Sequence, residues 1–185
     1  KVVQQMYDLG IRWIRCNMHW YNVEVEKGKF DWGVMGELVD AAYENRMHAF
    51  VELMGTAEWA SSATSSAIGS IDTGAEWSSV APRDFHDWET FCRRTAERFN
   101  GRVKFYEIWN EPGAPRNGQS NGFWRDSSDN FIQLIKHARK AIRSVDPDAK
   151  IMVAGFRPVD IGRYFQNFVE RIFREFAAGK SPIAI

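Results

Sequence analysis

The sequence predicts an α/β fold and, within that class, an incomplete (β/α)8 barrel. Helical and strand patterns alternate along all 185 residues, which favours parallel strands joined by crossover helices. The expected strands run into polar and aromatic residues, where a barrel collects its functional side chains: CNMHW, MGTAEW, WNEP and AGFRP. The competing doubly wound sheet would show a glycine-rich turn after its first strand, and none is present. Because a whole barrel needs about 250 residues, we expect residues 1–185 to form one incomplete domain, roughly strands 2 to 6, with the remainder of the barrel missing at both ends.

The first half of the chain predicts two helices and two strands. Residues 2–9 have helical spacing, and Gly10 suits the left-handed turn that closes a helix. IRWIRCNM (11–18) alternates as a half-buried strand does. A loop containing EKGKFDW then leads to a helix over about 34–46, and HAFVELM (48–54) is the second expected strand.

A long serine-rich connection over 55–82 precedes the third helix, expected over about 84–99. The apolar residues of this helix recur at helical spacing and form one face: Phe85, Trp88, Phe91, Cys92, Ala96 and Phe99. RVKFYEIW (102–109) is the third expected strand.

The last third of the chain repeats the pattern. A helix is expected over 129–145, because its apolar stripe stops before Pro147, and KIMVAG (150–155) is the fourth expected strand. A further helix is expected over the apolar positions from 161 to 176, and SPIAI (181–185) has the pattern of a strand that has only begun.

Composition argues against several classes of partner and cofactor. The 24 basic residues balance the 24 acidic ones, so no long-range field attracts nucleic acid or an anionic membrane, and we expect neither as a partner. The four histidines have no paired spacing of a metal site, so no metal or other cofactor is expected. Cys16 and Cys92 are expected to be buried free thiols rather than a disulfide. The chain opens in mid-pattern, so its lack of a signal peptide carries no information.

The stretch KFYEIWNEPGAP (104–115) carries the strongest chemical signal. Pro112 cannot donate to a sheet ladder and disfavours helical geometry at the preceding residue, so the strand ends with Asn110 and Glu111 at the barrel mouth. Partial burial among aromatic side chains favours the neutral form of a carboxyl group, which can then donate a proton near neutrality. From the residues alone, the alternative is a carboxylate that caps the following loop.

The chain resembles the retaining glycoside hydrolases of clan A. YEIWNEP is similar to their fourth-strand motif, and further similarity follows in the same order along nearly the whole chain: GIRWIR, EKGKFDW, GTAEWAS, DWETFCRRTAERFNGRVKFYEIWNEP and VDPDAKIMVAG. The resemblance is closest to family 39, which includes β-xylosidases and α-L-iduronidase-like enzymes, with family 5 as runner-up. It implies a glycosidase that acts on an oligosaccharide, polysaccharide or other glycoside.

The resemblance also implies roles for particular residues. Glu111 would be the general acid/base, and Asn110 would bind the sugar hydroxyl next to the anomeric carbon. In retaining enzymes a second carboxylate about 5–5.5 Å from the acid/base is the nucleophile. Family members carry it at the end of the seventh strand, which we expect to lie beyond Ile185, so the 185-residue chain alone is expected to be inactive.

Arg15 has two interpretations that are compatible with each other. The resemblance implies that an arginine near this point supports the nucleophile. Alternatively, Arg15 lies inside the barrel, on the strand face shared by Trp13 and Asn17, and pairs with Glu52 or Glu107. These two glutamates lie below the strand ends, so we interpret them as interior ion-pair members rather than catalysts.

Three further residues are candidates for substrate binding. Trp59 lies just past the second strand and could stack on a sugar, with core packing as the alternative. His19 follows the first strand and could reach a sugar hydroxyl, or lie on the surface. Trp124 could close a subsite, although anchoring the helix over 129–145 is the favoured interpretation.

Two rival functions remain at this point. A non-catalytic carbohydrate-binding barrel would keep the aromatic mouth, but it has no need of an amide beside a proton-donating carboxyl group at Asn110 and Glu111. A barrel enzyme of unrelated chemistry would need metal or phosphate motifs, which are absent from the sequence. Neither the sugar nor the oligomeric state can be predicted. Secretion is expected only by analogy with polysaccharide-degrading enzymes.

Overall fold

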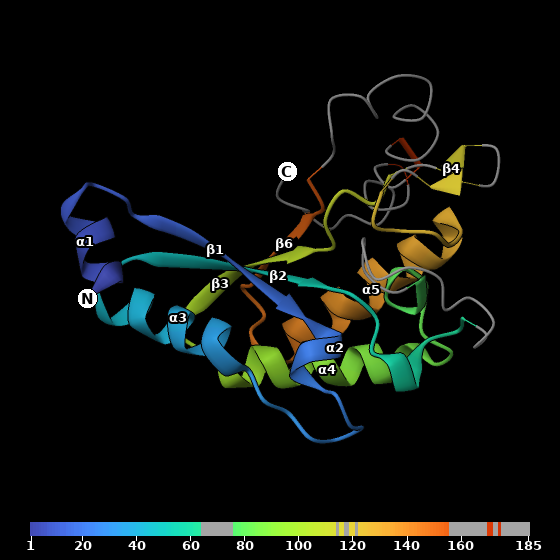
Figure 1. The fold of residues 1–185 in the computed structure, drawn as a ribbon, viewed down its shortest axis with the longest axis horizontal. Helices are drawn as coiled ribbons and strands as arrows, with labels where there is room; N and C mark the ends of the chain where they lie inside the picture. The colour runs from blue at the N-terminus through green and yellow to red at the C-terminus, as the bar shows by residue number, and fades with distance from the viewer. Residues whose placement is uncertain are drawn as a thin grey trace.

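The computed structural model describes residues 1–63, 76–113, 115–116, 119–120, 122–155, 170–171 and 174. Its centre is a parallel sheet in the order β1-β2-β3-β6. The strands are β1 (Trp13–His19), β2 (His48–Met54), β3 (Val103–Ile108) and β6 (Lys150–Val153). Figure 1 shows three helices along one face of this sheet: α3 (Gly33–Glu44), α4 (Phe85–Arg98) and α5 (Ser128–Val145). Parallel strands with crossover helices are the predicted architecture, and the prediction is confirmed.

The strand register puts the functional ends together. Asn17 pairs with Glu52, Glu52 with Glu107, and Glu107 with Met152, so these four residues form one level across the sheet. Because all four strands are parallel, their carboxyl ends lie at the same edge. The loops after them therefore share one end of the molecule.

Local chemistry explains where the elements begin and end. After α1 (Val2–Asp8), Gly10 has φ +90° and donates to the Tyr7 carbonyl at 2.9 Å, so the expected helix closure is confirmed. This turn delays the first strand, which begins at Trp13 rather than at the expected residue 11. Asp84 caps α4 and Ser127 caps α5, each by accepting a backbone N–H of the first turn.

Several short elements were not predicted. They are α2 (Trp20–Val23), the 3-10 helices η1 (Glu58–Ala60) and η3 (Glu76–Ser79), and the two-stranded ladder of β4 (Pro115–Arg116) and β5 (Gln119–Ser120). The fourth strand ends at Val153, two residues earlier than expected. The helix expected from 161 to 176 lies outside the described residues, apart from helical positions 170, 171 and 174, as does the strand expected over 181–185.

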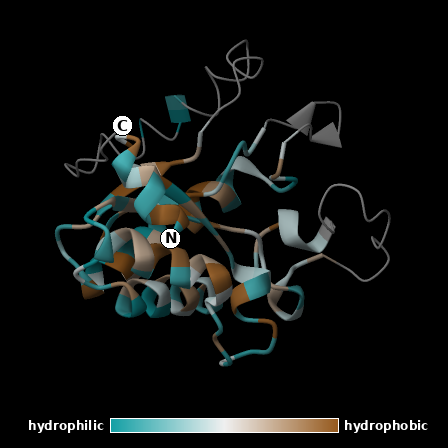
Figure 2. Ribbon diagram, turned by 60° about the vertical axis from the view of Figure 1, so that its left-hand side comes forward, coloured by the Kyte–Doolittle hydropathy of each residue, from teal (hydrophilic) through white to brown (hydrophobic). Residues whose placement is uncertain are grey.

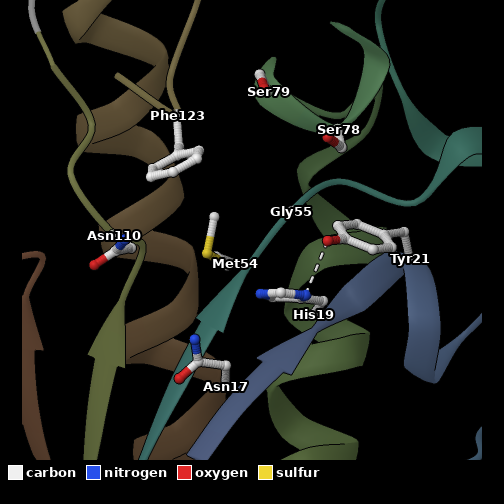
Figure 3. A pocket seen from close by; sticks show the side chains of 9 residues that line it. All are labelled: Asn17, His19, Tyr21, Met54, Gly55, Ser78, Ser79, Asn110 and Phe123. Carbon is white, nitrogen blue, oxygen red and sulfur yellow. Dashed lines mark hydrogen bonds between the residues drawn. The ribbon is translucent and has the colours of Figure 1, made fainter. Parts of the chain in front are cut away.

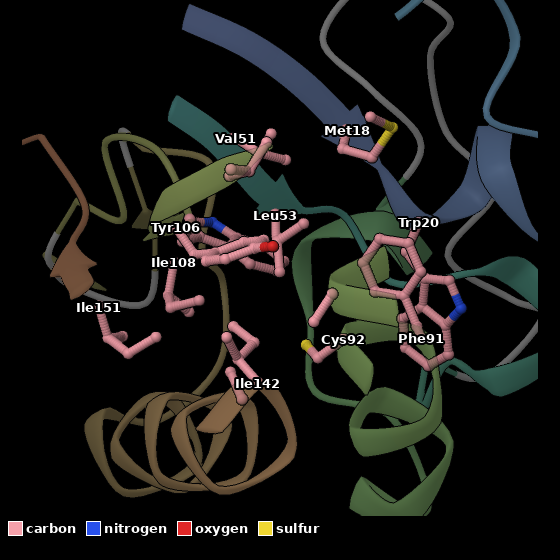
Figure 4. Close-up of a cluster of buried hydrophobic side chains, with 14 of the residues drawn as sticks. Met18, Trp20, Val51, Leu53, Phe91, Cys92, Tyr106, Ile108, Ile142 and Ile151 are labelled. Atoms are coloured by element: carbon pink, nitrogen blue, oxygen red, sulfur yellow. The ribbon is translucent and has the colours of Figure 1, made fainter. Parts of the chain in front are cut away.

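The core lies between the sheet and helices α4 and α5. Figure 4 shows its side chains meeting across this layer: Val51, Leu53, Tyr106 and Ile108 from the sheet, Phe91 and Cys92 from α4, and Ile142 from α5. The two helices are also joined by the Trp88 indole N–H, which donates to the Leu134 carbonyl at 3.0 Å. Hydrophobic and hydrophilic stretches alternate along the helices (Figure 2), and the buried residues of α4 and α5 recur at helical spacing.

Both cysteines are buried and free, as predicted. Within the described part of the chain, no helix has the length and apolarity that crossing a bilayer requires.

Candidate active site

A pocket of about 260 Å³ opens at the carboxyl edge of the sheet (Figure 3). It is lined by residues that end or follow the first three strands: Asn17, His19, Tyr21, Met54, Gly55, Ser78, Ser79, Asn110 and Phe123. Polar side chains and two aromatic rings therefore surround one hollow. Two of the predicted site residues, His19 and Asn110, line this pocket at the ends of the described strands.

The backbone between Trp109 and Pro112 is unusual. Trp109 has φ +72° and Glu111 has φ +38°, both in the left-handed region that residues with side chains rarely adopt. A backbone hydrogen bond to the neighbouring strand holds the start of the segment: the Trp109 N–H donates to the Leu53 carbonyl at 2.8 Å. The regular strand stops at Ile108, so the predicted termination before Pro112 is confirmed.

Backbone bonds hold Glu111 on two sides. Its N–H donates to the Gly155 carbonyl at 3.0 Å, and its carbonyl accepts the Phe123 N–H at 2.9 Å. The chain also passes very close to Gly122. A Cβ there would lie 2.5 Å from the Gly113 nitrogen and closer still to the Glu111 carbonyl oxygen, so only glycine fits. The candidate acid/base is thus fixed by the strand ends below it and by the loop above it.

Arg15 connects the first strand to this segment. Its Nε donates to Glu107 Oε2 at 2.8 Å, and one terminal nitrogen donates to Asn110 Oδ1 at 2.9 Å and lies 3.1 Å from Glu52 Oε1. Burial opposes the charged guanidinium, but the Glu107 hydrogen bond and the charges of Glu52, Glu107 and Glu111 raise the pKa of Arg15. The predicted pairing of Arg15 with Glu52 and Glu107 is confirmed, and Arg15 also touches the pocket residue Asn110. The two glutamates are buried, whereas Arg15 lies on the exposed side of β1.

A family model described as cellulase (glycosyl hydrolase family 5) matches residues 1–162. The chain belongs to glycosyl hydrolase family 5. A β-xylosidase from Caldicellulosiruptor saccharolyticus is 25% identical over an alignment of 162 positions, which covers 78% of this chain and 30% of that protein. The family 5 chain therefore spans less than a third of the length of this relative.

Solved structures show the same fold. A family 39 glycoside hydrolase from Bacteroides cellulosilyticus WH2 has a TM-score of 0.61 at 18% identity. The match covers 96% of this chain and 32% of the chain of that hydrolase. The endoglucanase Cel5A from Pseudomonas stutzeri has a TM-score of 0.59 at 21% identity. This match covers 90% of this chain and 47% of the endoglucanase chain. The predicted clan A resemblance and barrel class are confirmed. The predicted ranking of family 39 above family 5 is not confirmed, because the family model that matches is that of family 5, the predicted runner-up.

Glu52 is a buried carboxyl group below the pocket of the family 5 chain. It has no exposed surface, and neither oxygen has a hydrogen-bond partner among the described residues, because the nearby Arg15 nitrogen lies off the required direction. Burial raises the pKa of Glu52 to about 7; the Arg15 charge opposes this shift and the Glu107 charge adds to it. Glu52 and Glu107 are both interior partners of Arg15, as predicted.

The stability of the protein should therefore depend on the protonation of Glu52. An unfolded glutamate titrates near pH ~4.3, so the folded state holds this proton more tightly. Stability is then lost as pH rises from that value through about 7, by at most about 4 kcal/mol. Urea unfolding at pH 5 and pH 8 measures the loss, and Glu52→Gln, which cannot ionise, should reduce it. An equal loss in both proteins would show that another group is responsible.

His19 lines the pocket, and its predicted contact with a sugar hydroxyl stays a prediction. Its Nδ1 is 2.8 Å from the Tyr21 hydroxyl, and Figure 3 shows the other ring nitrogen directed away from Tyr21. Burial lowers the pKa of His19, which favours the neutral ring. Tyr21 was not predicted. Its ring packs on Gly55, where a Cβ would lie 2.5 Å from a ring carbon and φ is +73°, so glycine is required.

Trp59 lies outside the residues that line the pocket of the family 5 chain. Its ring packs edge-on against Trp20 at 5.6 Å, and its indole N–H donates to the Glu24 carbonyl at 2.8 Å. Lys27 lies 5.1 Å from the ring centroid. These contacts support the core-packing alternative, and the sugar-stacking role stays a prediction.

The contacts of Trp124 support its favoured interpretation as a helix anchor, and the subsite role stays a prediction. The side chain is buried, with its ring edge-to-face against Trp109 at 5.0 Å and Phe131 at 5.3 Å. Its indole N–H donates to the Ser127 carbonyl at 3.0 Å, at the start of α5. The aromatic residue exposed at the pocket is its neighbour Phe123.

Proposed function

We propose that the protein is a retaining glycoside hydrolase in which Glu111 is the general acid/base. The observation that carries the proposal is the placement of Asn110 and Glu111. They end the third strand of a family 5 fold, beside a pocket that Asn110 lines, and backbone bonds on both sides hold Glu111 in a left-handed conformation. Strain of this kind concentrates at functional sites.

The reaction has two steps in this proposal. Glu111 gives its proton to the departing glycosidic oxygen while a second carboxylate attacks the anomeric carbon. Glu111 then takes a proton from water, which hydrolyses the covalent intermediate with retention of configuration. None of the described pocket-lining residues is a carboxylate. We place the nucleophile beyond Ile185 and expect the 185-residue chain alone to be inactive.

Asn110 and His19 would hold the sugar. An arginine has only donors, so the Arg15 contact assigns the Asn110 oxygen to Arg15 and leaves the amide NH₂ for a sugar hydroxyl. A neutral His19, bonded to Tyr21 through Nδ1, would offer its second nitrogen. Arg15 would supply positive charge beside Glu111. We expect a β-glycoside as substrate, since the curated relative named above is a β-xylosidase.

The mechanism is tested by azide rescue of Glu111→Ala in the complete gene product. With dinitrophenyl β-xyloside, whose leaving group needs no proton, the variant should form the glycosyl-enzyme and then turn over slowly, because water lacks its base. Azide needs no base, so it should restore kcat and yield a β-xylosyl azide. An α-azide would contradict retention. Xyloside binding without hydrolysis by the wild-type protein would favour the rival, a non-catalytic sugar-binding barrel.

A further inference from the structure

The backbone of Gly155 forms hydrogen bonds with two glutamates, Glu107 and Glu111. Its N–H donates to Glu107 Oε1 at 3.0 Å, and its carbonyl accepts the Glu111 N–H, also at 3.0 Å. Gly155 follows β6, which lies beside β3 (Figure 1). The backbone of one residue on the neighbouring strand therefore joins the Glu107 side chain to the Glu111 main chain.

The other Glu107 oxygen determines the position of Arg15. Oε2 accepts the Arg15 Nε at 2.8 Å, and Arg15 in turn donates to Asn110 Oδ1 at 2.9 Å. Glu107 is buried, and it is not among the residues that line the pocket. Its carboxylate thus acts on the site through two routes, one to the backbone of Glu111 and one to the amide of Asn110.

We infer that Glu107 is a positioning residue for the proposed acid/base: it fixes the Gly155 backbone that holds Glu111 and the Arg15 side chain that holds Asn110. The inference rests on the proposed role of Glu111. It gives Glu107 a part in proton donation, whereas a simple interior ion pair would contribute only to stability.

The chemistry of the contact requires a full-length carboxylate. A glutamine has one acceptor oxygen, so it could accept from Arg15 or from Gly155, and its NH₂ would face the other donor. An aspartate keeps the charge but is one methylene shorter, so it cannot span both donors. Either change should let Glu111 shift, and a misplacement of about 1 Å costs up to ~100-fold in rate.

The test compares two substrates in the complete gene product. Cleavage of a phenyl β-xyloside needs a proton donor, whereas cleavage of a dinitrophenyl β-xyloside does not, and kcat/KM reports this step for both. Glu107→Gln should raise the dinitrophenyl-to-phenyl ratio of kcat/KM by about 10-fold or more. A change that only lowers the folded fraction reduces both values equally and leaves the ratio unchanged.

Glu24→Gln is the matched control. Glu24 is also a buried carboxylate with two donors, the Trp20 indole N–H and the Gly28 N–H, both at 2.7 Å. This variant should lose stability without a change in the ratio. Glu107→Asp should shift the ratio in the same direction as Glu107→Gln, and it replaces that variant if the glutamine protein does not fold.

The outcomes separate the two proposals. A ratio that changes in Glu111→Gln but not in the Glu107 variants overturns the positioning role and leaves the acid/base assignment standing. A ratio that changes in neither refutes the proposed role of Glu111, and the present inference is refuted with it. A change in Glu24→Gln as large as that in Glu107→Gln also counts against a specific role for Glu107.

Discussion

Replacing Glu111 with glutamine is expected to lower kcat/KM for a phenyl β-glycoside by about 10²–10⁴-fold, the usual contribution of a positioned general acid. Glutamine has nearly the same size and keeps the backbone bonds to Gly155 and Phe123, so the fold should persist. It cannot donate a carboxyl proton to the leaving oxygen. The measurement is steady-state hydrolysis by the complete gene product, with circular dichroism as the check of folding.

The control for this prediction is Glu26→Gln. Glu26 is exposed, and among the described residues its side chain pairs only with Lys29 three residues along, so its loss should change neither activity nor stability measurably. If Glu111→Gln lost no more activity than Glu26→Gln, the acid would have to be another residue. If Glu111→Gln lost activity on the dinitrophenyl and phenyl substrates equally, Glu111 would act by some means other than proton donation.

The position of the site could be predicted because local chemistry determines it. Pro112 ends a strand wherever that strand lies in space, and period-two alternation places Arg15 on the same strand face as Trp13 and Asn17. Burial then required a partner for each charged interior residue, which correctly indicated the pairing of Arg15 with Glu52 and Glu107. These are properties of single residues and their immediate neighbours.

The parts that were missed depend on contacts between distant segments. The Glu107–Gly155 bond joins residues 48 positions apart, and the Tyr21 ring covers Gly55 from another element. Aromatic residues in loops were the least predictable, because a sequence places them along the chain without giving their direction. Trp124 and Phe123 are adjacent, yet the first is buried in the core and the second lines the pocket.

Trp124→Ala is the variant expected to have the largest effect on stability. Removing a fully buried tryptophan leaves a cavity, and such changes cost about 3–5 kcal/mol of unfolding free energy. The indole also bonds the carbonyl of Ser127, the residue that caps α5. Trp124→Phe keeps an aromatic ring and should cost less. Chemical denaturation of the complete gene product measures both losses.

Kinetics on the same variants distinguish an anchor from a subsite. The Trp124 backbone N–H donates to the Pro112 carbonyl at 3.2 Å, next to Glu111, so the buried indole holds in place a stretch of backbone that supports the acid/base. An anchor predicts that the folded fraction of Trp124→Ala loses kcat while its KM changes little. A subsite predicts the reverse, a raised KM with nearly full stability, and that result would support the alternative role of Trp124 in substrate binding. Its complete burial between Trp109 and Phe131 is the physical reason to expect the first result.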